Sequence, residues 1–128
     1  MPELTVDELF FFDGKRPALP LYEALRERIL SEIPQVRIEV KKTQISFFCR
    51  RMFAAASFAP VRRAAERPDP FLTVTFGLPA PLKSSRIAAA EAAPRRWTHH
   101  VLIGTAEEID EELMSWLREA AAFSALKR

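Results

Sequence analysis

The chain has 128 residues, of which 48% are hydrophobic and 28% are charged, and its formal net charge is +2. These are values of a globular protein, and they exclude a largely disordered chain. A chain of this length can bury a core without disulfides or metals. We therefore expect a single domain over residues 1–128, with an N-terminal helix and connector in residues 1–20 and the body in residues 21–128.

Cysteine usage and the first residues point to one compartment. Cys49 is the only cysteine, so the chain can form no internal disulfide. Residues 1–8 are acidic where a signal peptide would be basic, and no apolar run reaches membrane-spanning length. These features favour a cytoplasmic protein without a membrane partner.

The charges are distributed unevenly along the chain. Residues 35–100 hold 12 Lys and Arg against 4 Asp and Glu, whereas the two flanks together hold 7 against 13. A basic block attracts anions by long-range electrostatics, although solvated charges on strands and loops need no partner. Both interpretations of the basic middle stay open.

Two helices are predicted before residue 35. Thr5 and Glu8 have the spacing of a capping box, and the helix they open should run to about Phe12. Its three successive phenylalanines must pack on the body or on a second copy of the chain, which makes a homodimer possible. Beyond Pro20, apolar residues at helical spacing predict a second helix that ends before Pro34.

Alternation with a period of two then predicts strands. Apolar positions are even in residues 36–40 and odd in residues 45–49, so a turn or bulge must fall within residues 41–44. Residues 50–51 should form a tight turn, followed by a strand over residues 52–59. After a charged, proline-rich segment, residues 72–78 form the clearest strand, in which Gly77 marks a bulge or a close approach.

The last part of the chain contains both histidines and one of the tryptophans. A short edge segment is expected over residues 86–90. In residues 96–103, Trp97 and His99 lie on one face of a strand and Thr98 and His100 on the other.

A second capping box, at residues 105–108, then predicts a C-terminal helix that reaches about Phe123. Its buried stripe comprises five apolar residues: Ile109, Leu113, Trp116, Leu117 and Ala120. Its C-terminal end is complemented by three basic residues, Arg118, Lys127 and Arg128.

Successive strands with turn-length connections indicate an antiparallel sheet, and amphipathic helices at both ends of the chain supply a second layer. The expected fold is therefore α+β: a two-layer sandwich with a mainly antiparallel sheet of four to six strands, flanked by N-terminal helices and one C-terminal helix.

Several kinds of active site are disfavoured by the sequence. Neighbouring residues on a strand point to opposite faces, so His99 and His100 cannot both bind one metal, and the usual ligand spacings are absent. Cys49 shares its parity with apolar neighbours and is interpreted as a core residue. Three scattered glycines form no phosphate-binding loop. We expect no metal, no cofactor and no identifiable catalytic residue.

A polar pocket for an anion remains the main candidate site. If the strands are neighbours, threonine hydroxyls, arginines and a histidine could converge there beside the tryptophan. The candidate ligand-binding residues are Thr73, Thr75, Arg86, Arg96, Trp97, His99 and His100. In the competing interpretation, Trp97 and His99 pack under the last helix and the arginines pair with its carboxylates.

The leading hypothesis is a binding module without enzymatic activity, for an anionic small molecule or an acidic partner. A nucleic-acid accessory domain is the first alternative, because aromatic residues are interleaved with the basic middle, although no recognition motif supports it. An enzyme acting through a histidine is the second alternative, and it requires an accessible imidazole beside another polar group.

Taken together, six short blocks resemble a bacterial family known as domain of unknown function 5655. The blocks are residues 21–25, 42–47, 74–78, 96–101, 108–113 and 121–124. The resemblance covers nearly the whole chain from Leu9 onward. It implies a domain that occurs alone or attached to larger bacterial proteins, some of them nuclease-like, and it brings no catalytic residue with it.

Overall fold

Residues 3–126, which the computed structural model describes, form three α-helices and one six-stranded sheet. The α-helices are α1 (Val6–Phe11), α2 (Leu19–Glu32) and α3 (Glu111–Ala125). The strands are β1 (Arg37–Val40), β2 (Gln44–Phe48), β3 (Met52–Ser57), β4 (Leu72–Leu78), β5 (Ile87–Ala93) and β6 (Arg96–Ile103). Short 3-10 turns lie at η1 (Arg16–Ala18), η2 (Ala64–Glu66) and η3 (Ala106–Glu108).

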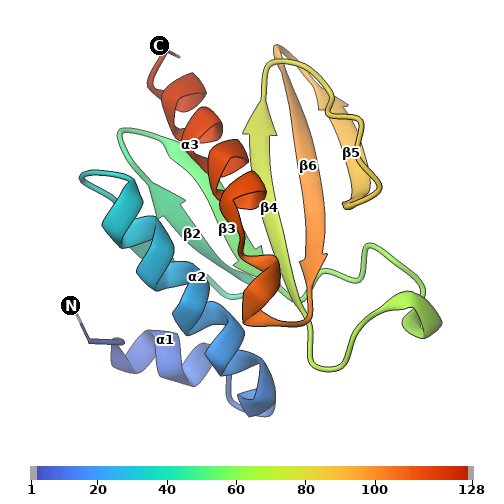
Figure 1. Cartoon of the computed structure of the whole chain (residues 1–128). Coiled ribbons are helices and arrows are strands. Elements are labelled where there is room, and N and C mark those ends of the chain that lie inside the picture. The colour runs from blue at the N-terminus through green and yellow to red at the C-terminus, as the bar shows by residue number, and fades with distance from the viewer. Residues whose placement is uncertain (1–2, 127–128) are drawn as a thin grey trace.

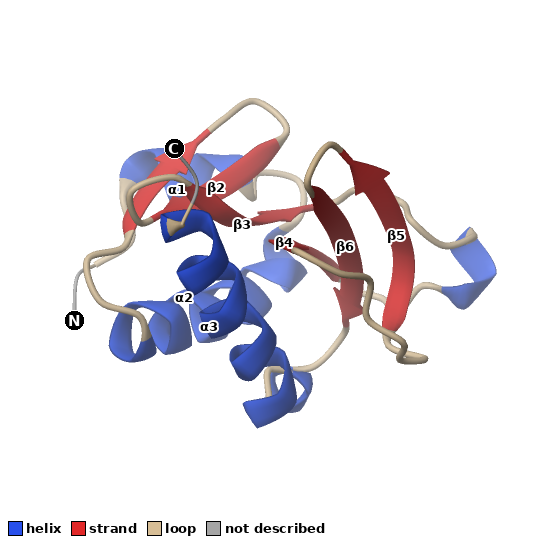
Figure 2. Cartoon of the chain, turned by 90° about the horizontal axis from the view of Figure 1, so that it is seen from above, coloured by secondary structure: helices blue, strands red, loops and turns tan. Residues whose placement is uncertain are grey.

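All strand pairs are antiparallel, and the strand order is β1-β2-β3-β4-β6-β5. Helices α2 and α3 lie side by side against one face of this sheet (Figure 1). The view from above shows the helical layer on one side of the strands (Figure 2). The predicted α+β two-layer sandwich, with its antiparallel sheet and its terminal helices, is confirmed.

The sequence predicted the N-terminal helix and its start correctly. The Glu8 backbone N–H donates to Thr5 Oγ1, and the Glu8 carboxylate accepts from the Thr5 N–H, which completes the capping box. The helix ends at Phe11, and Gly14 follows with a positive φ of 79°. The second helix starts earlier than predicted, at Leu19, because Pro20 is tolerated in a first helical turn.

The second capping box has a different role from the predicted one. Glu108 accepts hydrogen bonds from the N–H groups of Gly104 and Thr105, but the box closes only η3. The helix itself begins after Asp110, whose carboxylate accepts from the Leu113 N–H. The start of α3 was misplaced because Thr105 and Asp110, which lie within a stretch of six residues, can both cap a helix. The helix ends two residues beyond the prediction, and Lys127 and Arg128 lie outside the described residues.

The sequence predicted correctly which residues of the strands share a face of the sheet, but it did not predict where the strand pairing is irregular. The turn between β1 and β2 falls at residues 41–43, as expected. Gly77 marks no bulge, because it pairs in register with Thr98. Register shifts occur instead at residues 47–48 of β2 and residues 87–89 of β5. The edge strand β5 continues to Ala93, three residues beyond the predicted segment.

The core lies between the sheet and the two long helices. All five residues of the predicted stripe, Ile109, Leu113, Trp116, Leu117 and Ala120, are buried. They face buried sheet residues that include Ile45, Phe47, Val74, Phe76 and Val101. The predicted stripe is therefore confirmed, because the apolar residues at helical spacing are the ones that are buried.

Helix α1 is apolar on two sides. Phe12, which caps the helix, is fully buried in the core and packs against Tyr22, whereas Phe10 is 75% exposed and Val6 is 79% exposed. Packing on the body thus accounts for one side of the helix. A homodimer that covers the other side stays a prediction.

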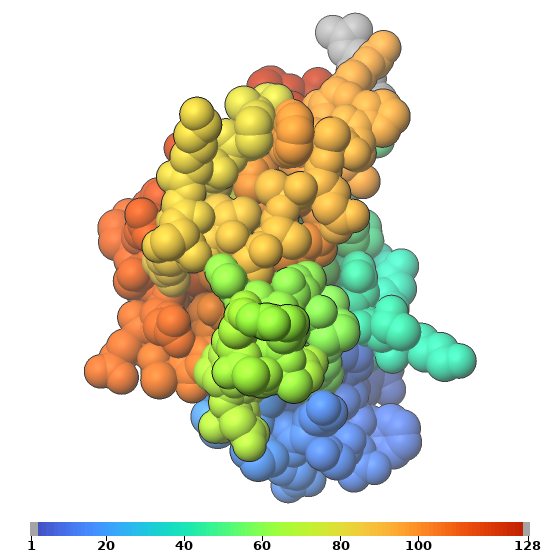
Figure 3. Space-filling view, turned by 90° about the vertical axis from the view of Figure 1, so that its right-hand side faces the viewer, coloured from blue at the N-terminus to red at the C-terminus, as the bar shows by residue number. Residues whose placement is uncertain are grey.

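The segment between β3 and β4 protrudes from the sheet. Figure 3 shows it as a lobe beside the strands β5 and β6. Its short turn, η2, has no buried residue. Among residues 3–126, no helix combines the length and the apolarity needed to cross a membrane.

A buried ion pair fixes α1 to α2. The Glu8 side chain is 1% exposed, and its carboxylate accepts hydrogen bonds from Arg26 Nε, at 2.8 Å, and from the Tyr22 hydroxyl. Burial opposes ionisation of Glu8, but the bonds from Thr5, Tyr22 and Arg26 outweigh it and lower the pKa. Burial is the main cause that raises the pKa of Tyr22, and the hydrogen bond to the Glu8 carboxylate raises it further, whereas Arg26 lowers it.

Removing the charge of Glu8 should destabilise the fold, because the buried Arg26 would lose its carboxylate partner. We expect Glu8→Gln to lower the free energy of unfolding by about 3 kcal/mol. Urea denaturation measures this change. The control Glu23→Gln, at an exposed position of α2, should stay within about 0.5 kcal/mol of the parent, and equal effects of the two variants would contradict the role of the ion pair.

Candidate functional site

The pairing of β4 with β6 decides which side chains share a face. Phe76 pairs with His99, and both lie on the face covered by α3, because Phe76 stacks on Trp116 with ring centroids 5.9 Å apart. The next pair, Thr75 and His100, therefore points to the opposite face. We call this opposite side the outer face of the sheet.

A hydrogen-bonded chain crosses three strands on the outer face. Thr75 Oγ1 on β4 lies 2.9 Å from His100 Nδ1 on β6, and His100 Nε2 lies 2.8 Å from a carboxylate oxygen of Glu91 on β5. The His100 side chain is 13% exposed and that of Glu91 is 70% exposed. We call Thr75, His100 and Glu91 the relay.

A pocket of about 300 Å³ opens where β3 and β4 separate. Their pairing stops at Ala54 and Phe76, although β3 begins two residues earlier and β4 ends two residues later. The polar lining residues come from four strands or their turns: Gln44, Arg51, Thr75, Thr98 and Arg96. Apolar residues from the strands and the end of α3 complete the lining: Met52, Phe53, Ala54, Ala55, Phe76, Ala120 and Phe123. Gly77 and Ser124 also contribute.

Two arginines give this pocket its electrostatic character. Arg51 precedes β3 and Arg96 begins β6, and antiparallel pairing brings these positions to the same end of the sheet. Figure 1 shows the turns before β3 and before β6 at this end, near the C-terminus of α3. Within residues 3–126, the guanidinium group of neither arginine has a hydrogen bond or an ion pair, and none of the lining residues is acidic.

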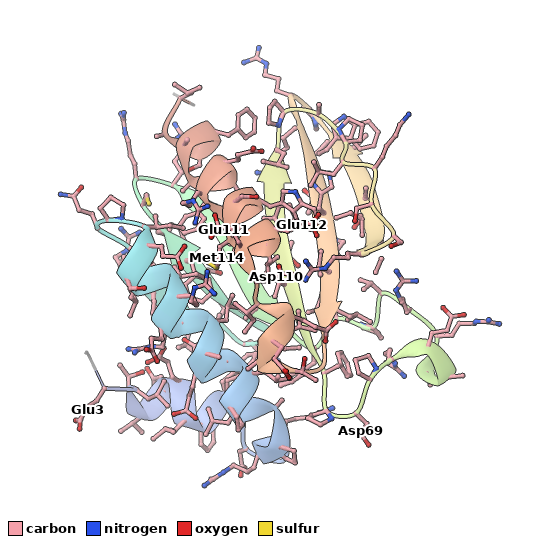
Figure 4. The ribbon with its side chains drawn as sticks, viewed as in Figure 1. Glu3, Asp69, Asp110, Glu111, Glu112 and Met114 are labelled. Carbon is pink, nitrogen blue, oxygen red and sulfur yellow. The ribbon has the colours of Figure 1, made fainter. Side chains whose placement is uncertain are left out.

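Arg86, in contrast, is fully paired. Its guanidinium lies 2.9 Å from Asp110 and 3.0 Å from Glu112, and it also donates to the Glu108 carbonyl. It stacks over Trp116 at 5.7 Å. Burial opposes the charge, but the two carboxylates outweigh it and raise the pKa of Arg86. Figure 4 labels Asp110 and Glu112 at the start of α3, away from the pocket.

The remaining candidates lie apart from the pocket lining. Thr73 is fully buried and donates to the Ala59 carbonyl. Trp97 is half-buried on the helix-covered face. His99 is fully buried on that face, stacks on Phe76, and accepts a hydrogen bond from the Leu82 N–H at Nε2. Thus the structure brings together Thr75 and Arg96, with His100 adjacent, but not the other four.

Nucleophile and metal chemistry find little support elsewhere. Cys49 was interpreted as a core residue; it packs against the hydrophobic core but is only half-buried, and it lines a second pocket between the ends of α2 and α3. Burial raises the pKa of its thiol, which disfavours the reactive thiolate. In the described part of the chain, no three His, Cys, Asp or Glu side chains form a group that could hold a metal ion.

The family is decided by the sequence comparison. The model of the family described as "Domain of unknown function (DUF5655)" matches residues 10–124, nearly the whole chain. The chain belongs to the DUF5655 family. Searches of curated proteins and of solved structures found no match.

The pocket of this DUF5655 domain contains residues that the sequence analysis did not select. Arg51 was assigned only to a tight turn and Gln44 only to the turn or bulge within residues 41–44. Thr98 was placed on the same face as His100 but was not selected as a ligand-binding residue, and Glu91 of the relay was not considered.

No signal in the sequence would bring Arg51 and Arg96 together, because an up-and-down sheet would place the turns before the third and sixth strands at opposite ends. The structure brings them to one end because β4 and β5 both run antiparallel to β6. Glu91 had no signal either, because its register depends on the irregular pairing at residues 87–89.

The buried His99 should make stability depend on pH. Burial lowers the pKa of His99, and this effect outweighs the backbone of Phe76 and Trp97, which raises the pKa. Nδ1 has no hydrogen-bond partner among the described residues. Because Nε2 accepts from Leu82, the neutral ring carries its hydrogen on Nδ1, and a second proton would face the Leu82 N–H.

With a lowered pKa in the folded state, the unfolded chain takes up the proton first, so stability is lost as the pH falls below about 6.5. We expect the free energy of unfolding to fall between about pH 7 and pH 5 in the parent, and less steeply in His99→Gln. Urea denaturation across this range measures both slopes. Parallel slopes would refute the assignment to His99.

Proposed function

We propose that this DUF5655 domain binds an anionic small molecule in the pocket between β3 and β4. The observation that carries the proposal is the pair of uncompensated arginines, Arg51 and Arg96, in a concave site without a carboxylate. Other exposed arginines either pair with a nearby glutamate, as Arg37 and Arg63 do, or lie outside the lining of this pocket, as Arg16, Arg50 and Arg95 do. An anion in the pocket would supply the missing charge partner.

The lining also suggests the kind of anion. Guanidinium groups and the hydroxyl of Thr98 offer hydrogen bonds to oxygen atoms of a carboxylate, sulfate or phosphate group. Phe123 and Met52 offer apolar contacts in the same pocket. Small-molecule sites typically combine a few directed polar groups with an apolar wall, so a compact anion that carries an apolar group fits best.

A nucleic acid is a poorer fit than a small anion. Stacking on bases needs exposed aromatic rings, but Phe47 is fully buried and Phe53 is 3% exposed. The Phe48 ring is already covered by the cations of Arg37 and Lys41. A steep loss of single-stranded DNA binding with salt would nevertheless favour the nucleic acid.

Titration with sulfate and with benzoate, followed by amide NMR shifts, tests the proposal. We expect the largest shifts around Thr75, Gly77 and Thr98. Each of the variants Arg51→Gln and Arg96→Gln should weaken binding about tenfold, because a charged hydrogen bond contributes roughly 1.5–3 kcal/mol.

The matched control is Arg63→Gln, which removes the same charge from the protruding segment between β3 and β4. It should leave the affinity within about a factor of two, since exposed charges at a distance are screened. Equal weakening by all three variants would reduce the effect to net charge and would remove the pocket as its site.

A further inference from the structure

The relay limits what Thr75 can do for a bound anion. A carboxylate oxygen only accepts hydrogen bonds, so the contact with Glu91 requires the hydrogen of neutral His100 to be on Nε2. Nδ1 then carries a lone pair, and the Thr75 hydroxyl must donate its only hydrogen to it. In this state Thr75 presents only lone pairs to the pocket that it lines.

Protonation of His100 reverses the polarity of this hydrogen bond. Imidazolium donates from both nitrogens, so Nδ1 donates to Thr75 Oγ1 while Nε2 stays bonded to Glu91. The Thr75 hydroxyl hydrogen is then free to rotate into the pocket. We propose that anion binding in this pocket is coupled to the uptake of a proton by His100, which turns Thr75 from an acceptor into a donor.

This inference rests on the proposed function and adds its regulation by pH. The coupling acts in both directions, because a bound anion that accepts from Thr75 favours the protonated ring to the same extent as the protonated ring favours the anion. The positive charge of the ring adds to that of Arg51 and Arg96, which line the same pocket as Thr75.

The strands beside His100 carry few other charges. Two arginines of the neighbouring segment between β3 and β4 (Figure 3) are bonded elsewhere, Arg62 to the Ser85 carbonyl and Arg63 to Glu66. Strand β4 contributes only uncharged side chains, and β5 contributes Glu91 as its one charged residue. Strand β6 itself carries Arg96 at its start and His99, which points to the opposite face. Each side of the ring thus has a defined partner, with Thr75 on one nitrogen and Glu91 on the other.

The experiment is calorimetric titration of the full chain with sodium sulfate, whose charge does not change between about pH 5.5 and pH 8. We expect sulfate to bind about tenfold more tightly at the lower pH, since one charge-assisted hydrogen bond is gained. Titration at about pH 7 in two buffers of different ionisation enthalpy should show the uptake of a fraction of one proton per sulfate.

Two kinds of variant separate the relay from a general effect of charge. His100→Gln cannot titrate, so sulfate affinity should become nearly independent of pH, and the proton uptake should vanish. Thr75→Val keeps the shape but lacks the hydroxyl, and it should lose most of the pH dependence. Thr75→Ser restores a hydroxyl and should restore the pH dependence. Circular dichroism confirms folding of each variant at both pH values.

The outcomes distinguish this inference from the proposed function. If sulfate binds and binding needs Arg51 and Arg96, but the affinity does not change with pH, the coupling is wrong and the site stands. The same holds if the parent and His100→Gln show equal pH dependence. If sulfate does not bind at any pH, or binds without the arginines, the proposed function itself fails.

Discussion

The register between β4 and β6 is the constraint on which the rest of the structure depends. It joins seven residue pairs in the middle of the sheet, and each pair assigns its side chains to one face. The pair Phe76 and His99 is stacked in the core beneath Trp116, while the pair Thr75 and His100 forms the relay on the outer face. A shift of β6 by one residue would turn His99 away from Phe76 to the outer face. It would also separate His100 from Thr75, so core packing and the relay are fixed together.

The fold was largely predictable because local signals agreed with one another. Periods of two and of 3.6 separated strands from helices, and the parity change between residues 40 and 45 located a turn that the structure confirms. What failed were choices between competing local signals. The start of α3 was misplaced because Thr105 and Asp110 can both cap, and the register shifts in β2 and β5 carry no residue type that announces them.

The candidate site was only partly predictable, because it depends on pairing between distant segments. Parity correctly separated His99 from His100. The competing interpretation, in which the arginines pair with carboxylates of the last helix, is confirmed for Arg86, which contacts Asp110 and Glu112 at the start of α3. It is wrong for Arg96, which has no such partner among the described residues. Composition counts arginines equally, whereas the structure divides them into those whose guanidinium pairs with a carboxylate, such as Arg86, and those, such as Arg51 and Arg96, whose guanidinium has no partner among the described residues.

The central claim is that the unpaired arginines at the end of the sheet form an anion site where β3 and β4 separate. A crystal of the chain grown with selenate, whose selenium is located by anomalous scattering, tests it most directly. The account predicts a selenium peak within hydrogen-bonding distance of both Arg51 and Arg96, beside Thr75. Peaks confined to other exposed arginines such as Arg16, with the pocket free of selenium, would contradict it.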